Sequence, residues 1–263
     1  MASLREIVEE AYRVFADAPV GPMPQVCLCP VCFDGDTALA RRLVTTPLRD
    51  IPADLLAAYT NSAHGWCDEM RYFLPRYLDL LARGEVPGWN GPEYVLSRLS
   101  LVPWRETWPA AEREALERFF DTLLEHALGC RPGEQNWRHP DGSREFIFHG
   151  TPVPPIVGLV SMAGGDLGRL LRIADATRGR SADLHFAAVV GDVIRPLFRE
   201  RFHWGTTTPG DDSERRLLAW LLRPEMEQRL EAAFFASDDP VEAAALSDAV
   251  ALLDRGRAAE GGW

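Results

Sequence analysis

The sequence contains no lysine, and all 28 of its basic residues are arginine. This absence excludes catalysis through a Schiff-base lysine and phosphate binding through a Walker-type lysine, because both need a primary amine. The 39 acidic residues outnumber the arginines and give a formal net charge of −11. A chain this acidic is repelled by phosphate backbones, so we expect no nucleic-acid partner.

Long apolar runs are also missing. No stretch reaches the roughly 18 consecutive apolar residues that a membrane-spanning helix needs, and the opening MASLREIVEE is acidic where a signal peptide is basic and then apolar. We therefore expect no membrane span, no signal peptide and a cytoplasmic location. In a reducing compartment, clustered cysteines more often hold a metal than pair as disulfides.

Cysteine is scarce, yet three of the five cysteines among the 263 residues fall in the stretch C27-L-C-P-V-C32. Cys27, Cys29 and Cys32 offer three thiolates from one tight loop, and zinc prefers four ligands in a tetrahedron. The segment S62-A-H-G-W-C67 offers either His64 or Cys67 as the fourth ligand. The pattern therefore predicts a structural zinc site. Two alternatives are small buried thiols without a metal, and an iron–sulfur or redox role.

Helix signals dominate the chain. Ser3 followed three residues later by Glu6 is typical of a capping box, and Pro75 should kink or restart the helix in which it lies. Residues 109–129 carry the clearest apolar face, and Gly84 is a plausible left-handed helix end. We predict a mainly α fold: an irregular helical array with two lobes, a small Cys-rich metal knuckle near the N-terminus and a short β-hairpin in the middle.

A change in composition suggests the division into lobes. The stretch around residues 131–155 is rich in glycine, proline and polar residues, and its EFIFH run resembles a strand. We predict an N-terminal helical lobe over residues 1–130 with the cysteine loop at 27–32, a linker or short hairpin over 131–155, and a C-terminal helical lobe over 156–263. Helices in the last lobe are expected at roughly 165–178, 182–202, 213–222, 224–236 and 240–255, with Ser213 and Asp239 as caps.

Three runs carry a resemblance to a known family: T46-P-L-R49, Y59-T-N-S-A-H64 and Y72-F-L-P-R-Y-L78. With them the chain resembles an uncharacterised family of bacterial proteins of about this size, in which a cysteine loop precedes a leucine-proline-arginine helix. The resemblance covers the first half, up to the helix that ends near Gly129. It implies no activity, because its motifs are typical of packing.

Two functions of different classes agree with these patterns. The first is a cytoplasmic helical interaction protein with a structural zinc site, whose acidic surface meets a basic protein partner, as in toxin-immunity or regulatory binding. The second is a metal-dependent hydrolase with a pocket between the lobes, to which His149, His185 or Asp192 would contribute. The sequence assigns no catalytic residue and no oligomeric state.

Overall fold

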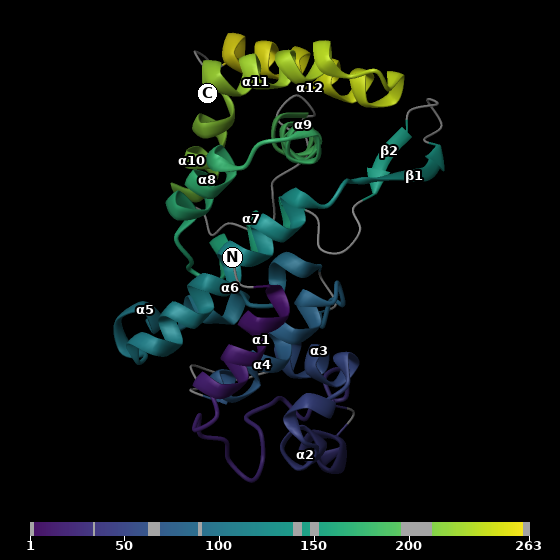
Figure 1. The fold of residues 1–263 in the computed structure, drawn as a ribbon. Helices are drawn as coiled ribbons and strands as arrows, with labels where there is room; N and C mark the ends of the chain where they lie inside the picture. Colours follow the sequence, from purple (N-terminus) through teal and green to yellow (C-terminus); the bar gives the residue numbers. More distant parts are fainter. Residues whose placement is uncertain are drawn as a thin grey trace. The chain divides into compact units, whose positions relative to one another are not determined.

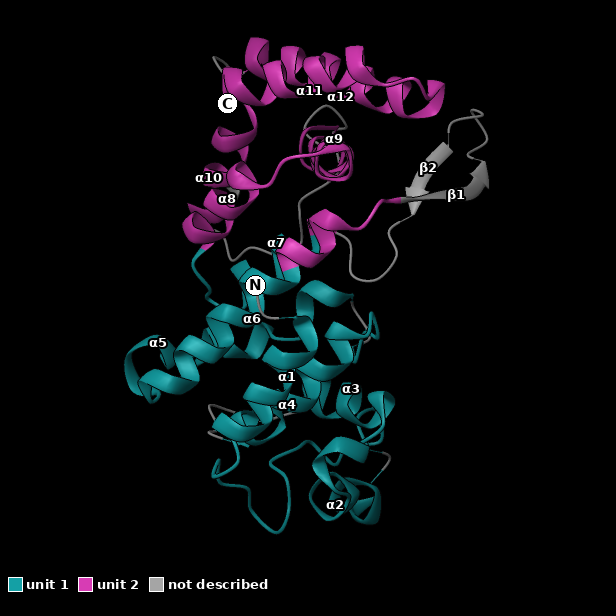
Figure 2. Cartoon of the chain, in the orientation of Figure 1, with its two compact units in different colours: residues 1–123, 155–166 teal, residues 124–154, 167–263 magenta. Residues whose placement is uncertain are grey.

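The structure is a computed structural model, and it describes residues 3–33, 35–62, 69–88, 91–138, 144–147, 153–195 and 212–259. The protein is mainly helical, as predicted (Figure 1), and it has a cysteine cluster near residues 27–32. The chain forms two compact units, which Figure 2 colours separately. Unit 1 comprises residues 1–123 and 155–166, and unit 2 comprises residues 124–154 and 167–263. Residues 155–166 thus belong to the first unit, although they follow the hairpin in sequence.

Unit 1 is built from helices and short 3-10 turns in chain order. They are α1 (Leu4–Val14), α2 (Thr37–Thr45), η1 (Leu48–Asp50), α3 (Ala53–Ser62), α4 (Glu69–Ala82), η2 (Pro92–Tyr94), η3 (Ser97–Leu101), α5 (Trp104–Thr107), most of α6 (Ala110–Gly129) and most of α7 (Val153–Met162). Two predictions are confirmed here: the helix over 109–129 and the end of α4 at Gly84, where φ is +73°. A left-handed glycine at that position lets Glu85 donate its amide to the Leu80 carbonyl at 2.9 Å and so close the helix end.

The first helix begins at the predicted capping box. The amide of Ser3 donates to Glu6 Oε2 at 2.7 Å, and the amide of Glu6 donates to Ser3 Oγ at 3.3 Å. These bonds satisfy amides that have no partner within the helix. Helix α1 packs against α4. Its buried face is formed by Ile7, Val8 and Ala11.

Helix α4 is the most deeply buried helix of unit 1, and Pro75 lies inside it. The sequence left two outcomes open at Pro75, a kink or the start of a new helix, and the second is excluded because α4 runs unbroken from Glu69 to Ala82. Burial explains why the helix tolerates Pro75, because its neighbours Phe73, Leu74 and Tyr77 are fully buried. The apolar contacts of this stripe compensate for the one helical hydrogen bond that proline cannot make.

Unit 2 contains a hairpin and a group of helices. Strands β1 (Gly133–Arg138) and β2 (Arg144–Ile147) pair antiparallel, with Gly133 opposite Ile147. The helices are α8 (Leu167–Ala176), α9 (Arg180–Ile194), α10 (Asp212–Leu221), α11 (Pro224–Ala236) and α12 (Pro240–Ala259). Helix α12 packs against both α9 and α11. At the buried Gly256 of α12, an added Cβ would lie 2.8 Å from Leu222 Cδ2, just after α10, and 3.4 Å from Cγ2 of Ile194, the last residue of α9.

Of the two helix caps predicted in unit 2, the structure confirms one. Asp239 is the predicted cap of α12, and its Oδ1 accepts the amide of Val241 at 2.9 Å. Ser213 is not the cap of α10, because that helix already begins at Asp212. None of the described helices is both long enough and apolar enough to cross a membrane.

Candidate metal centre

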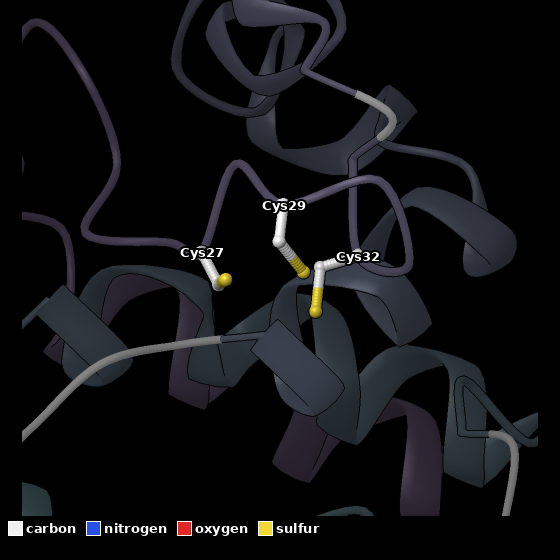
Figure 3. A group of neighbouring side chains, drawn as sticks. All are labelled: Cys27, Cys29 and Cys32. Carbon is white, nitrogen blue, oxygen red and sulfur yellow. The ribbon is translucent and has the colours of Figure 1, made fainter.

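Three sulfur atoms converge in the loop that connects α1 to α2. The Sγ atoms of Cys27, Cys29 and Cys32 all lie within 4.8 Å of one another, and all three side chains are half-buried (Figure 3). In the parts of the chain that the structure describes, no other group of three histidine, cysteine or acidic side chains is arranged to hold an ion. The three cysteines therefore lie close enough to bind a metal ion.

A tight turn brings the sulfurs together. The amides of Cys32 and Phe33 both donate to the carbonyl of Cys29 at 3.1 Å, and the amide of Gly35 donates to the carbonyl of Leu28 at 3.0 Å. Pro30 lies inside this turn, where its fixed φ removes a degree of freedom from the unbound loop. The spacing Cys29-Pro30-Val31-Cys32 is the C-x2-C spacing found in zinc knuckles.

The electrostatics of the cluster favour one thiolate and disfavour a second. A hydrogen bond from the Cys27 thiol, together with the amides of Cys32 and Val31, lowers the pKa of Cys29 from 9.0 to about 7. The Cys29 sulfur in turn raises the pKa of Cys32 to about 11. Two neighbouring thiolates repel each other, so without a cation the second proton is retained. A divalent ion would remove this repulsion and release the proton.

The loop is fastened to the rest of unit 1 on both sides of the cysteines. Val26, just before the first cysteine, and Phe33, just after the last, are both buried in the core. The amide of Gln25 donates to the carboxylate of Glu69 at 3.1 and 3.3 Å, and the amide of Cys27 donates to the carbonyl of Ser62 at 2.8 Å. The loop is therefore positioned by the end of α3 and the start of α4.

Glu69 is an unusual anchor because it is 6% exposed. Its burial raises the pKa of its carboxyl group, while the Gln25 amide and the Tyr59 hydroxyl act in the opposite direction. Nothing in the sequence singled out Glu69, because a glutamate in the first turn of a helix is ordinary. Its contact with the loop depends on packing between segments 44 residues apart.

The donor set fits zinc better than a hard cation. Thiolates bind zinc at about 2.3 Å, and in a tetrahedron this places neighbouring sulfurs about 3.8 Å apart. In the structure the sulfurs all lie within 4.8 Å of one another, which is at most about 1 Å farther apart than in this arrangement. Magnesium and calcium prefer oxygen ligands, whereas the described group consists of three sulfur donors.

The predicted fourth ligands, His64 and Cys67, lie outside the described residues. The described residues on either side of this segment, Ser62 and Glu69, both contact the backbone of the cysteine loop.

The residues predicted for the alternative hydrolase do not gather into a site among the described parts of the chain. His149 lies outside the described residues. His185 is 2% exposed, and its Nε2 lies 2.8 Å from the carbonyl oxygen of Cys130. Burial lowers the pKa of His185, which keeps the imidazole neutral inside unit 2. Asp192, seven residues further along α9, is exposed.

Comparison with known proteins adds no functional information. No protein-family model, no curated protein and no solved structure matches this chain. The functional argument consequently depends on the geometry of the cysteine cluster.

Proposed function

We propose that Cys27, Cys29 and Cys32 bind one zinc ion, and that this ion is structural. The observation that carries the proposal is the convergence of three sulfurs within 4.8 Å on a loop whose flanks are buried. Thiolate-rich zinc sites are predominantly structural, whereas catalytic zinc sites keep an open position for water and usually use histidine and carboxylate ligands.

The length of the connection explains what a metal would contribute. No helix or extended strand is assigned to the described residues between the end of α1 and the start of α2, over positions 15–36. Connections of this length are uncommon in compact domains, and ordering them costs conformational entropy. A cation that joins three points of the loop would offset part of this cost and hold the loop against α3 and α4.

Metal analysis tests this proposal directly. Protein purified without chelator should carry one equivalent of zinc by native mass spectrometry. The double variant Cys27→Ser/Cys29→Ser should carry none, and the control Cys130→Ser should retain the full equivalent because Cys130 lies in unit 2, outside the cluster. Native protein without any bound ion would refute the proposal.

The wider role that we propose is that of a helical binding protein with a basic protein partner, for which toxin neutralisation is the most concrete form. The support is the net charge of −11, which favours rapid encounter with a cationic surface. Affinity capture from the host should recover a basic protein whose association weakens steeply as salt is raised. Capture of no partner at low salt would contradict this role.

The metal-dependent hydrolase is the competing proposal, and stoichiometry separates the two. A hydrolase of this kind requires a second, exchangeable metal or an open coordination position at the first. One equivalent of zinc that is removed only with loss of helical structure would support the binding protein. Two equivalents, one of them exchangeable, would support the hydrolase.

A further inference from the structure

A polar cavity lies in unit 1, apart from the cysteine loop. Its volume is about 350 Å³, and Thr60 and Asn61 of α3 form one side. The lining also includes Gly88 and four residues of η2 and η3, which are Tyr94, Ser97, Arg98 and Leu101. This volume is at the lower end of the range of about 300–1,000 Å³ for small-molecule sites.

Among the described residues that line the cavity, Arg98 has the only charged side chain. Its Nε donates to the carbonyl of Thr60 at 2.6 Å, which fixes the plane of the guanidinium group. Among the described residues, no carboxylate lies within ion-pair distance of Arg98. Its two terminal nitrogens make no hydrogen bond there either, and they form the edge of the guanidinium that can bind a planar oxyanion with two parallel bonds.

Several partly buried arginines of unit 1 are paired with carboxylates. Arg71 Nη2 lies 2.5 Å from Glu112 Oε1, and Arg118 Nη2 lies 2.6 Å from Glu10 Oε1. Burying part of a cation without an anion costs free energy, so such pairs are the usual solution. Arg98 has no such partner among the described residues and lies in the lining of a cavity, where an anionic ligand would supply the missing charge.

The rest of the lining limits the kind of anion. A single cation matches a single negative charge, and a chain with net charge −11 disfavours a dianion such as phosphate. Asn61 donates one side-chain N–H to the carbonyl of Ala57 at 2.8 Å, and its amide oxygen can act as an acceptor. Leu101 is 41% exposed and offers an apolar wall.

We propose that this cavity binds a small organic monocarboxylate, with its carboxylate on the terminal nitrogens of Arg98. A hydroxyl or amide group on the ligand would donate to Asn61, and a compact apolar body would lie along Leu101. The proposal is independent of the zinc site. The two sites share only α3, whose last residue, Ser62, accepts the bond from the cysteine loop.

Mandelate is a suitable probe because it combines a carboxylate, a hydroxyl group and a small ring. Isothermal titration of the zinc-loaded full-length protein at constant ionic strength should show saturable mandelate binding. The neutral analogue mandelamide should bind at least about tenfold more weakly, because it cannot form charge-assisted bonds. Inorganic phosphate should also bind more weakly than mandelate.

Variants assign the binding to the cavity. Arg98→Gln should weaken mandelate binding at least about tenfold, whereas Arg42→Gln, an exposed arginine of α2, should leave it unchanged. Leu101→Trp should block the cavity without disturbing the core, because Leu101 is exposed, and it decides the question if Arg98→Gln does not fold. Equal binding of mandelamide, tighter binding of phosphate, or unchanged binding by folded Arg98→Gln or Leu101→Trp would each overturn the proposal.

Discussion

The backbone amide of Cys27 donates a hydrogen bond to the carbonyl oxygen of Ser62, with a nitrogen–oxygen distance of 2.8 Å. This bond joins the first cysteine of the cluster to the last residue of α3. Two residues earlier, the amide of Gln25 reaches Glu69, the first residue of α4. The cysteine loop is therefore held by the last residue of α3, Ser62, and by the first residue of α4, Glu69. A substitution at either residue should change the positions of the sulfur atoms.

Glu69 gives the first test of this coupling. Because burial raises its pKa, the native state disfavours its charge. The protonated carboxyl group of Glu69 therefore stabilises the native state at pH values below its pKa in the unfolded chain. This stabilisation is lost as the pH rises through its higher pKa in the native state. Glu69→Gln keeps an acceptor for Gln25 without the charge, so its unfolding free energy at pH 7 should equal or exceed that of the wild type.

Glu69→Ala is the matched comparison, because it leaves the Gln25 amide without its partner. We expect a loss of about 1–3 kcal/mol of unfolding free energy in urea titrations, together with weaker zinc retention. If Glu69→Gln proves as destabilised as Glu69→Ala, the anchor requires the charge, and the account of its pKa is wrong.

Cys29 provides a test through pH. In the metal-free protein its pKa is lowered to about 7 from an ordinary value of 9.0. The thiolate therefore contributes stability above pH 9, and this contribution is lost as pH falls through 7. Alkylation of Cys29 by iodoacetamide, mapped by peptide mass spectrometry, should rise with a midpoint near pH 7 in the native state and near pH 9 in urea.

Zinc should suppress this alkylation at every pH at which it stays bound, because a coordinated thiolate is shielded from attack. Cys130 serves as the internal reference, since its modification should be independent of zinc. Alkylation of Cys29 that is insensitive to added zinc would show that the cluster does not coordinate the ion.

The sequence predicted the helical class and the cysteine cluster because both depend on local signals. The capping box of Ser3 and Glu6 and the glycine end of α4 involve residues a few positions apart. The three cysteines fall within six residues, so chain geometry alone keeps their sulfurs close together. Predictions of this kind need no knowledge of how distant segments pack.

Features that depend on distant packing escaped prediction. Helix α7 was missed because VPPIVGLVSM is apolar on all sides and begins with two prolines, so it shows no helical periodicity. Residues 155–166 join unit 1 through contacts such as the bond from Trp104 Nε1 to the Ala163 carbonyl at 2.8 Å. The cavity beside Arg98 was missed for the same reason, since it forms only when α3 meets η3.

The fourth ligand of the metal centre can be identified by paired substitution. If Cys67 completes the tetrahedron, Cys67→Ser should lower zinc affinity at least about tenfold, and His64→Ala should have little effect. If His64 is the ligand instead, His64→Ala should lower the zinc affinity and Cys67→Ser should have little effect. Competition with a chromophoric chelator measures both affinities. Unchanged affinity in both variants would remove this segment from the site and leave a position open for water.

Glu242 of unit 2 yields the last prediction, because one buried carboxylate is shared by two exposed arginines. Glu242 is 1% exposed in its side chain, whereas Arg131 is 63% and Arg180 is 51% exposed. Both guanidinium groups contact the carboxylate, Arg131 through Nη2 and Arg180 through Nε. The three partners consequently differ in what their removal leaves behind.

Removing both arginines should destabilise the protein more than removing the carboxylate. The double variant Arg131→Gln/Arg180→Gln leaves a buried charge uncompensated, which costs about 3–5 kcal/mol. Glu242→Gln leaves two exposed arginines that water can hydrate, so we expect a loss of only about 1–3 kcal/mol. Urea unfolding at saturating zinc measures both losses, with the exposed pair Arg215→Gln/Arg216→Gln as a control of equal charge change. A larger loss for Glu242→Gln than for the double arginine variant would mean that the burial of the carboxylate does not determine the energetics of this cluster.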